Sequence, residues 1–491
     1  MKKILAYLKV QKPNLPRAGV ITLIIAIPLF PKFPIFTVPK TYVAIRTEDF
    51  IILFFGLILL FYLFTQIKTF LTDNLSRSII IYLVVGLVSL LSALLITKNI
   101  TPHLAFLHWA RRIEYFLPFF ITIFAISKSF EVFGLLYLLL AVGVLVVIYG
   151  VGQIYFGLPV ISTTNEEFSK GLLLPLTGPA ARANSTFAGS YDLGAFLVIV
   201  LVVSIAFLFT QKPAWLTSIK VRIPTLLAAI SFYWLLLQTG SRISFIAFLA
   251  GASLMLFLLG RRLLMVPIII LSLLGLFIFS SDLSQRFIIT FQQGVKIFQQ
   301  QIQNRQSAIF QVLAATSTPT AAQIKIPTAT QASKPASFTP PITAETEPPA
   351  PGEPANLAER IIFRSGNIRF DVEWPRAARA FLKNPILGTG YSSIGLATDN
   401  DYLRVLGETG ILGFLAFVAI FVEIGRRIFK FFQNKVENES KVIVAAISGA
   451  AFAILMIATF IDIFEASKIA ILFWILIGML VVTIRQSHIS R

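Results

Sequence analysis

The chain has 491 residues, of which 56% are hydrophobic and only 13% are charged, whereas about 25% of residues are charged in an ordinary soluble protein. A mean hydropathy of +0.81 over this length requires many apolar segments, because one or two membrane anchors would be diluted by the rest of the chain. The composition therefore excludes a soluble enzyme. The absence of cysteine excludes disulfides, thiolate nucleophiles and zinc–sulfur or iron–sulfur sites.

Apolar runs of spanning or near-spanning length occupy most of the chain. The first, 19–37, is followed by no small-residue cleavage site and is interrupted by prolines, which predicts an uncleaved membrane helix. The run at 113–127 is short unless its helix begins before Arg111 and Arg112. Further runs occupy 50–67, 78–97, 130–157, 191–210, 223–240, 243–260, 263–280, 402–425, 441–461 and 468–484. We therefore predict an all-α polytopic membrane protein with about twelve transmembrane helices.

The positions of Lys and Arg predict the orientation, because cytoplasmic loops collect these residues. The net charge is +19, from 42 Lys and Arg against 23 Asp and Glu. With both termini in the cytoplasm, the short inner loops hold pairs such as Arg261-Arg262 and Arg426-Arg427, and the short outer loops hold roughly half as many cations. We therefore predict both termini inside and a large extracytoplasmic loop between the ninth and tenth helices.

Composition divides the chain into three predicted parts. Residues 1–280 form N-terminal membrane helices of about nine spans, and residues 401–491 form C-terminal membrane helices of about three. The extracytoplasmic loop, 281–400, lies between them. Within it, residues 314–356 are rich in Pro, Thr, Ala and Ser and cannot bury enough apolar surface to repay ordering, which predicts a disordered insert.

With this topology, four polar features converge on the external face. The first is Arg182 with Asn184, just before the span that begins near Tyr191, and the second is Ser241-Arg242, between two spans with almost no loop. The third is a stretch of loop arginines that includes Arg369, with Trp374 among them. The fourth is the start of a span, with Asp399, Asn400, Asp401 and Tyr402, followed by Arg404 and Glu408 within the apolar run.

Arginine at a membrane boundary has a simple structural explanation, in which its long stem reaches towards the headgroups. Arg242 is harder to explain in this way, because it is predicted on the outer side whereas Lys and Arg usually collect in cytoplasmic loops. Several external arginines together predict an anionic ligand, since the guanidinium fork suits phosphate oxygens. For the set Arg360, Arg364 and Arg379 we favour a solvated helix face.

The acidic residues allow more than one interpretation. Asp399-Asn400-Asp401 contains a D-x-D pattern of metal sites, but a helix cap before an apolar run explains one of the three residues well. Glu408 is either functional or a buried, paired carboxylate. The G-T-G at 388–390 lacks the context of a nucleotide loop and predicts a turn. The three histidines are scattered, so neither a metal site nor a catalytic triad is expected.

These motifs resemble those of the O-antigen ligase and O-antigen polymerase superfamily, polytopic glycosyltransferases that use polyprenyl-diphosphate-linked sugars. The resemblance covers most of the chain from about residue 110, apart from the insert. It is carried by R-x-x-x-T-F at 182–187, Ser-Arg at 241–242, NPILGTGY at 384–391 and DNDYLRVLGETGILG at 399–413. Ligases of this family have His-Asn where this chain has Asp399-Asn400, a difference that favours a polymerase or related transferase.

The resemblance implies a GT-C-like bundle in the bacterial inner membrane, with its active face extracytoplasmic. It implies glycan transfer from a polyprenyl diphosphate carrier to a hydroxyl of a second lipid-linked saccharide, without cofactor, metal or nucleic acid. The alternatives are an O-antigen ligase that uses a lipid or protein acceptor, a small-anion transporter resembling bicarbonate carriers, and a non-catalytic assembly partner. The expected partners are the oligosaccharide donor, the saccharide acceptor, the lipid bilayer and other polysaccharide-assembly proteins.

The residues expected to act in this reaction follow from the four features. We predict that Arg182, Arg242 and Arg369 bind the diphosphate and that Asp399, at the position of the family histidine, is the base, with Glu408 as the second candidate. The predicted substrate-binding residues are Asn184, Ser241, Trp374, Asn400, Asp401, Tyr402 and Arg404.

Overall fold

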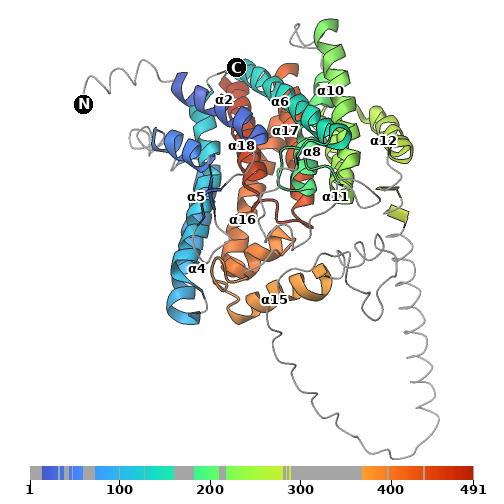
Figure 1. Ribbon diagram of the computed structural model, residues 1–491. Coiled ribbons are helices and arrows are strands. Elements are labelled where there is room, and N and C mark those ends of the chain that lie inside the picture. Colours follow the sequence, from blue (N-terminus) through green and yellow to red (C-terminus); the bar gives the residue numbers. More distant parts are fainter. Residues whose placement is uncertain are drawn as a thin grey trace, which may run out of the picture. The chain divides into compact units, whose positions relative to one another are not determined.

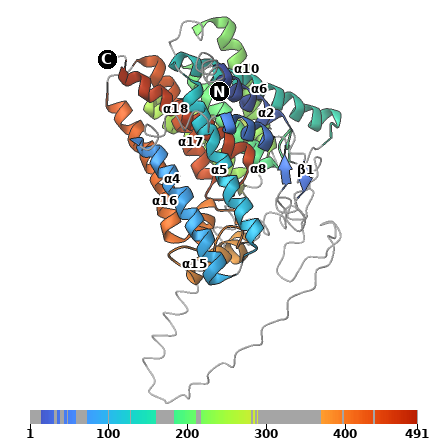
Figure 2. The same ribbon diagram turned by 90° about the vertical axis from the view of Figure 1, so that its left-hand side faces the viewer.

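The structure of the protein is a computed structural model, shown in Figures 1 and 2. Its chain contacts divide it into two units, Met1–Leu283 with Ser365–Arg491, and Ser284–Arg364. The predicted insert, 314–356, lies outside the described residues, and the fold below is that of the first unit. The structure describes residues 14–30, 34–37, 44–46, 48–58, 72–98, 100–126, 128–159, 182–209, 217–279, 283–284, 287–288, 368–394, 398–434 and 437–489.

The described part of the first unit is almost entirely helical (Figure 1). Its α-helices are α2 (Asn14–Leu29), α4 (Asn74–Ser92), α5 (Pro102–Ala125), α6 (Ser129–Phe156), α8 (Ser190–Leu208), α10 (Ile219–Gln238), α11 (Arg242–Leu258), α12 (Met265–Phe279), α15 (Trp374–Lys383), α16 (Asp401–Gln433), α17 (Asn438–Ile457) and α18 (Ser467–Ile489). Short helical turns are η1 (Ala93–Thr97), η2 (Arg262–Leu264) and η3 (Ile368–Glu373).

Helical residues coincide, at least in part, with every predicted span, including 48–58 for the second. Among the described residues, eight helices are long and apolar enough to cross a membrane by themselves, whereas Leu15–Leu29 and Arg242–Leu258 are shorter. α5 begins at Pro102, well before its two arginines, but it is not one of these eight helices. The helical membrane fold is therefore confirmed, and the number twelve and the position of the long loop stay predictions.

The predicted first span, 19–37, is wrong at its C-terminal end. α2 ends at Leu29, and β1 (Pro34–Thr37) pairs with β2 (Ala44–Arg46) in an antiparallel hairpin, visible in Figure 2. Proline lacks an N–H group and disfavours helical conformation in the residue before it, so Pro31 and Pro34 prevent the helix from continuing. This hairpin is a small exception to the predicted all-α class.

Ion pairs tie three helices together at one end of the bundle, which we call the Asp73 end. Asp73 caps the start of α4 and contacts Arg427 near the end of α16 and Arg485 near the end of α18, at 2.9 and 2.8 Å. Burial alone would raise the pKa of Asp73, but the hydrogen bond from Ser76 N–H and the charges of Arg427 and Arg485 lower it to about 2. The start of α4 therefore lies beside the ends of α16 and α18.

The opposite end of the bundle, which we call the Asp399 end, joins the other helix termini. Lys468 at the start of α18 donates to the carbonyl of Thr186, just before α8, at 2.9 Å. Asp401 N–H at the start of α16 donates to the carbonyl of Ala458, just after α17, at 3.0 Å. Lys468 also donates to the carbonyl of Pro28, near the end of α2, at 3.4 Å. The first residue of α2 and the last residue of α18 therefore both lie towards the Asp73 end.

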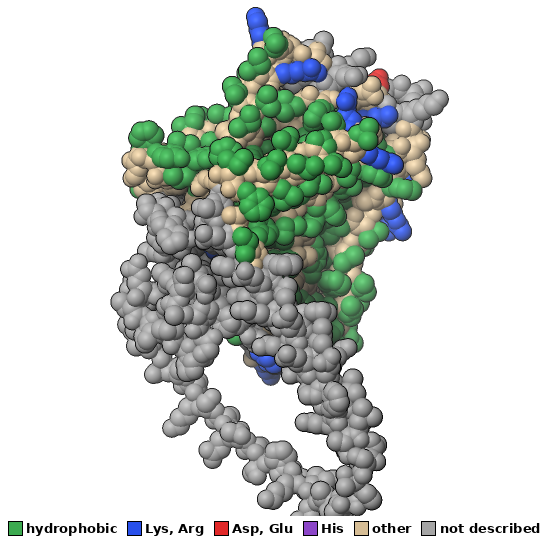
Figure 3. Space-filling model, turned by 90° about the vertical axis from the view of Figure 1, so that its right-hand side faces the viewer, with side chains coloured by type: hydrophobic (Ala, Val, Ile, Leu, Met, Phe, Trp, Pro, Cys, Tyr) green, Lys and Arg blue, Asp and Glu red, His purple; other side chains and the backbone are tan. Residues whose placement is uncertain are grey.

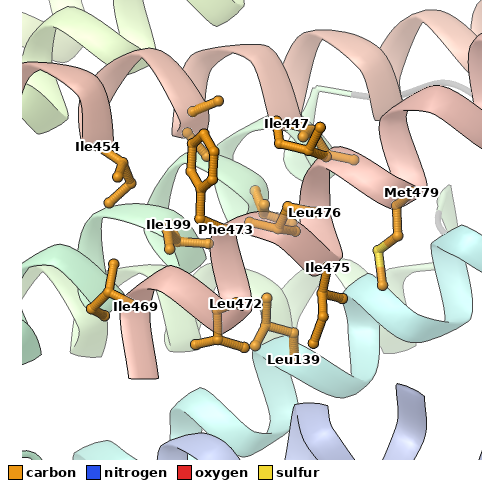
Figure 4. Close-up of a cluster of buried hydrophobic side chains, with 14 of the residues drawn as sticks. Leu139, Ile199, Ile447, Ile454, Ile469, Leu472, Phe473, Ile475, Leu476 and Met479 are labelled. Carbon is orange, nitrogen blue, oxygen red and sulfur yellow. The ribbon is translucent and has the colours of Figure 1, made fainter. Parts of the chain in front are cut away.

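The core centres on α18, which is buried along its length because neighbours cover it on every side. Figure 4 shows side chains of α18 such as Phe473 and Leu476 packed against Leu139 of α6, Ile199 of α8 and Ile447 of α17. Figure 3 shows the opposite case, a broad face of exposed hydrophobic side chains over α10 and α12 with most of its Lys and Arg near one end. An apolar surface of this extent suits lipid rather than water.

Candidate functional site

The segment before α8, residues 182–189, is held rigidly at the Asp399 end. Ala183 N–H donates to the carbonyl of Gln238 at the end of α10, and Ser185 Oγ donates to that of Val146 in α6. Ser185 has φ of 50°, a left-handed conformation that non-glycine residues seldom adopt and that the surrounding hydrogen bonds enforce. This anchoring fixes the position of Arg182.

Four predicted or neighbouring polar residues meet beside this segment. Arg369 on η3 donates from Nε and Nη2 to Asp399 Oδ2, at 3.0 and 2.9 Å. The guanidinium of Arg182 lies over the Tyr191 ring, 5.4 Å from its centroid, and Tyr191 interacts electrostatically with Arg182, Arg369 and Asp399. We call these four residues the Tyr191 cluster.

The Tyr191 cluster holds two guanidiniums and one carboxylate, and the nearby carboxylate of Glu373 also acts on Arg369. Burial alone would lower the pKa of Arg369, but the neighbouring Tyr191 and Asp399 raise it above its usual value, so this cation is permanent. Arg182 Nε is buried and has no hydrogen-bond partner among the described residues. A buried donor without a partner is costly, which makes Arg182 a candidate for binding an acceptor from a ligand.

Asp462 holds the backbone on both sides of Asp399. Its Oδ2 accepts from Thr398 N–H at 2.6 Å and its Oδ1 accepts from Asn400 N–H at 3.0 Å. Asp399 itself has φ of 49°, another left-handed conformation. Clamping the two flanking amides forces this turn and directs the Asp399 side chain towards Arg369. Asp462 is therefore a positioning residue.

A second group of charges lies deeper, and we call it the Arg404 network. Arg404 Nη1 donates to Asp462 Oδ2 at 3.0 Å, and its Nε lies 3.4 Å from Glu465 Oε1 and 3.6 Å from Glu408 Oε1. Glu465 also contacts Arg112 of α5. Arg404, Glu408 and Asp462 are each less than 5% exposed. The network therefore joins α5, α16 and the turn between α17 and α18.

The predicted residues at the start of α16 have their polar atoms engaged in contacts within the protein. Asn400 Oδ1 accepts from Leu403 N–H at 2.9 Å, which makes it the helix cap, and its Nδ2 donates to the carbonyl of Thr459. Asp401 Oδ2 accepts from two amides of the 459–466 turn, and Tyr402 Oη donates to the carbonyl of Leu455. These contacts favour a structural role for all three residues.

The two acids of the D-x-D pattern contact different partners. Asp399 contacts Arg369, whereas Asp401 accepts hydrogen bonds from the amides of Ile463 and Phe464. In the part of the chain that the structure describes, no group of three His, Asp or Glu side chains is placed to hold a metal ion. The geometry thus favours the cap interpretation of this motif over a shared metal site.

The motifs NPILGTGY and GETG interlock at a break in α16. Gly410 has φ of 66° and ψ of −169° within the helix, a conformation that is almost restricted to glycine. The loop at 385–390 supplies partners for the interrupted backbone: Gly390 N–H donates to the Glu408 carbonyl, and Ile411 N–H donates to the Pro385 carbonyl. Residues 388–390 lie in this loop, just after a turn at 385–387, and the loop supplies hydrogen-bond partners to the broken helix.

The remaining predicted residues lie near the Tyr191 cluster or at helix starts. Ser241 caps α11 by accepting from Ser244 N–H, so Arg242 is the first residue of that helix. Trp374 begins α15 and packs against Phe370, and its indole N–H is buried without a partner among the described residues. Asn184 is half-buried beside Arg182.

Sequence reasoning did not identify Tyr191, Asp462, Glu465 or Arg112 as parts of the site. A signal for the acids was present, because D-I-F-E-A-S-K at 462–468 places charges in a very short turn between two apolar runs. Charges in such a position require partners. Tyr191 had no comparable signal, since a tyrosine at the start of a span is an ordinary interfacial residue.

The fold and the site define a multi-pass α-helical membrane protein with a cationic cluster at one end of its bundle. Residues 226–418 match a family model described as O-antigen ligase, which confirms the resemblance to the O-antigen ligase and polymerase superfamily. The match includes Arg242, Arg369 and Asp399 but ends before Asp462 and begins after Arg182. No curated protein matches the chain. The match and the apolar helices support a role in polysaccharide biosynthesis at a membrane.

Proposed function

We propose that the protein transfers a glycan from a polyprenyl diphosphate carrier to a hydroxyl of a second lipid-linked saccharide, as a polysaccharide polymerase. The bond between the anomeric carbon and the diphosphate oxygen breaks, and the acceptor oxygen forms a bond to the same carbon. The acceptor hydroxyl loses its proton, and the polyprenyl diphosphate leaves with the electron pair. The protein must position two substrates and stabilise negative charge on the leaving group.

The observation that carries this proposal is the meeting of two guanidiniums, of Arg182 and Arg369, in the Tyr191 cluster. Its residues come from segments far apart in the sequence, at 182–191, 369 and 399, and they meet at one end of the bundle. A diphosphate is the part of the donor that such a cluster recognises. The family match, which covers Arg369 and Asp399, supports the same class of reaction.

In this mechanism the residues of the site have separate roles. Arg182 and Arg369 bind the diphosphate, and Arg242 adds its charge at the start of α11, where the helix dipole also favours an anion. Asp399 accepts the acceptor proton. Glu408 is the weaker candidate for the base because it is 2% exposed and lies against Arg404 within the network.

The proposed orientation puts both chain ends in the cytoplasm of a bacterium and the Tyr191 cluster on the outer side of its inner membrane. It is supported by the cations of the Asp73 end, which include Arg77, Arg426, Arg427 and Arg485. The concentration of Lys and Arg near one end of the apolar face in Figure 3 agrees with this arrangement. The donor glycan would then be presented at the Asp399 end.

The test is chain extension by the purified full-length protein in liposomes that contain a polyprenyl-diphosphate-linked oligosaccharide. Product length is followed by gel electrophoresis and mass spectrometry. Arg182→Ala and Arg242→Ala should each slow extension about 10²- to 10³-fold, since each removes a donor that stabilises developing charge. Asp399→Asn should slow it about 10²- to 10⁴-fold by removing the base.

The matched control is Arg379→Ala, which removes an exposed arginine from α15 outside the cluster and should leave the rate unchanged. Equal rates in wild type, Arg182→Ala and Arg242→Ala would rule out a role for these arginines in binding the diphosphate. Uptake of a small anion into the liposomes, with no change in the glycan, would support the transporter alternative instead.

Ligation is the second candidate, favoured by the description of the matching family as O-antigen ligase. A ligase would use the same diphosphate donor but a lipid or protein acceptor. It would therefore depend on Arg182 and Asp399 in the same way. Supplying the donor with a lipid acceptor that lacks a carrier diphosphate separates the two activities, because only a ligase forms product from that pair.

A further inference from the structure

A groove runs along the outer surface between α4 and α16, far from the Tyr191 cluster. Its volume is about 510 Å³, and it extends from the Asp73 end towards the middle of the bundle. The lining changes along its length. Arg77 and Arg426 lie at the Asp73 end, and apolar side chains line the remainder: Ile81, Leu415, Val418 and Val422. One polar, cationic end and one apolar channel match the two parts of a membrane lipid.

The cationic end of the groove carries more positive than negative charge. Glu423, the acid in the lining, is engaged with Arg427 at 3.0 Å, and nearby Asp73 is engaged with Arg427 and Arg485. Among the described residues, Arg77 and Arg426 have no ion-pair partner, and both are exposed. An anionic headgroup would complement these two guanidiniums, whereas a zwitterionic one would add a repulsive cation.

The length of the groove fits a single leaflet. Leu415 and Arg426 are 11 residues apart on α16, which at 1.5 Å per residue is about 16 Å along the helix. Half of a bilayer's hydrocarbon core is about 15 Å thick. An acyl chain lying over Leu415 would therefore place its headgroup at the level of the two arginines.

We infer that this groove binds an anionic phospholipid of the leaflet at the Asp73 end, with one acyl chain along α16 and the phosphate between Arg77 and Arg426. The site is independent of the proposed glycan transfer. Bound lipid would bridge α4 and α16, the helices that Asp73 and Arg427 already connect. Because both helices also reach the Asp399 end, the lipid would stabilise the scaffold of the candidate site from its opposite end.

The experiment uses native mass spectrometry of the full-length protein in detergent with phosphatidylglycerol or phosphatidylcholine of the same acyl chains. Wild type should retain phosphatidylglycerol preferentially. Arg77→Gln with Arg426→Gln should weaken that retention roughly 5- to 30-fold, the effect of one to two basic residues at an anionic surface. Ala419→Trp, which fills the groove without changing charge, should weaken retention of the phospholipid as well.

The matched control is Arg261→Gln with Arg262→Gln, which removes two arginines just before α12, outside the groove, and should keep the preference. A melting curve in phosphatidylcholine verifies that each variant is folded. The inference fails if the groove variants retain phosphatidylglycerol as wild type does, or if the control loses it equally. Preferential displacement of phosphatidylglycerol by a polyprenyl phosphate would assign the groove to the carrier instead.

Discussion

The Tyr191 cluster and the Arg404 network are neighbours at the Asp399 end, yet they differ in their balance of charge and in the burial of their central ion pairs. The network has two guanidiniums, of Arg404 and Arg112, against the carboxylates of Asp462, Glu465 and Glu408. The cluster has two guanidiniums against one carboxylate. The cluster is therefore the less acidic of the two groups, and we expect it to be the one that binds an anionic ligand.

The central ion pairs of the two regions also differ in burial. Arg404 is 3% exposed, whereas Arg369 and Asp399 are 13% and 14% exposed. A buried ion pair contributes little net stability, but removing one partner leaves an uncompensated charge that is costly. We therefore expect the network to be structural and intolerant of change, and we propose that the cluster exchanges its partners for a substrate. Under this proposal the charged residues within one motif, 399–408, serve two different purposes.

The largest expected effect tests the network. Asp462→Ala removes the acceptor of Thr398 N–H, Asn400 N–H and Arg404 Nη1 at once. We expect the free energy of unfolding to fall by about 3–5 kcal/mol, because three buried donors lose their partner. The measurement is the melting temperature in detergent.

The control for this change is Glu437→Ala, an exposed acid at the start of α17, whose loss should change stability by less than about 0.5 kcal/mol. If Asp462→Ala melted at the wild-type temperature while losing activity, Asp462 would belong with the functional cluster and not with the scaffold. That result would break the distinction between the two regions.

The next effect tests the cluster. Arg369→Gln should reduce glycan transfer about 10²- to 10³-fold, as the loss of a charge-stabilising donor does. Its effect on the free energy of unfolding should be about 1 kcal/mol or less, because its ion pair with Asp399 is partly exposed. Initial rates and melting temperatures measured on one preparation check both parts. A destabilisation as large as that of Asp462→Ala would show that Arg369 is structural.

The helices of the fold could be predicted because hydropathy reports them directly. The apolar runs that predict α6, α8 and α17 lie within a few residues of the observed helices. The end of α2 was missed because hydropathy takes no account of the conformational limits that Pro31 and Pro34 impose. The break in α16 was also hidden, since Gly410 lies in a run that remains apolar across it.

The site could be predicted only in part. Arg182 and Arg369 were predicted because they lie on the expected outer side, where few Lys and Arg are found. The structure brings both of them to Tyr191. Asn400, Asp401 and Arg404 were grouped with them because they are adjacent in sequence to Asp399. Their partners lie about 60 residues away in the 458–466 turn, and a single sequence contains no record of that contact. Sequence proximity alone therefore cannot separate residues with such structural contacts from those of the Tyr191 cluster.

The smallest effect concerns the helix break that separates the network from the membrane-spanning part of α16. In Gly410→Ala the new Cβ would lie 2.4 Å from the Ile386 carbonyl oxygen and would be held at φ of 66°. We expect a loss of about 1–3 kcal/mol in stability. Gly425→Ala, in the same helix, places its Cβ in open space and should stabilise by about 0.5–1 kcal/mol. Opposite shifts in melting temperature would confirm that the break at Gly410 is built into the fold. A stabilised Gly410→Ala variant would instead mean that α16 can run straight past the loop at 385–390, which would release Glu408 and Arg404 from the geometry of the network.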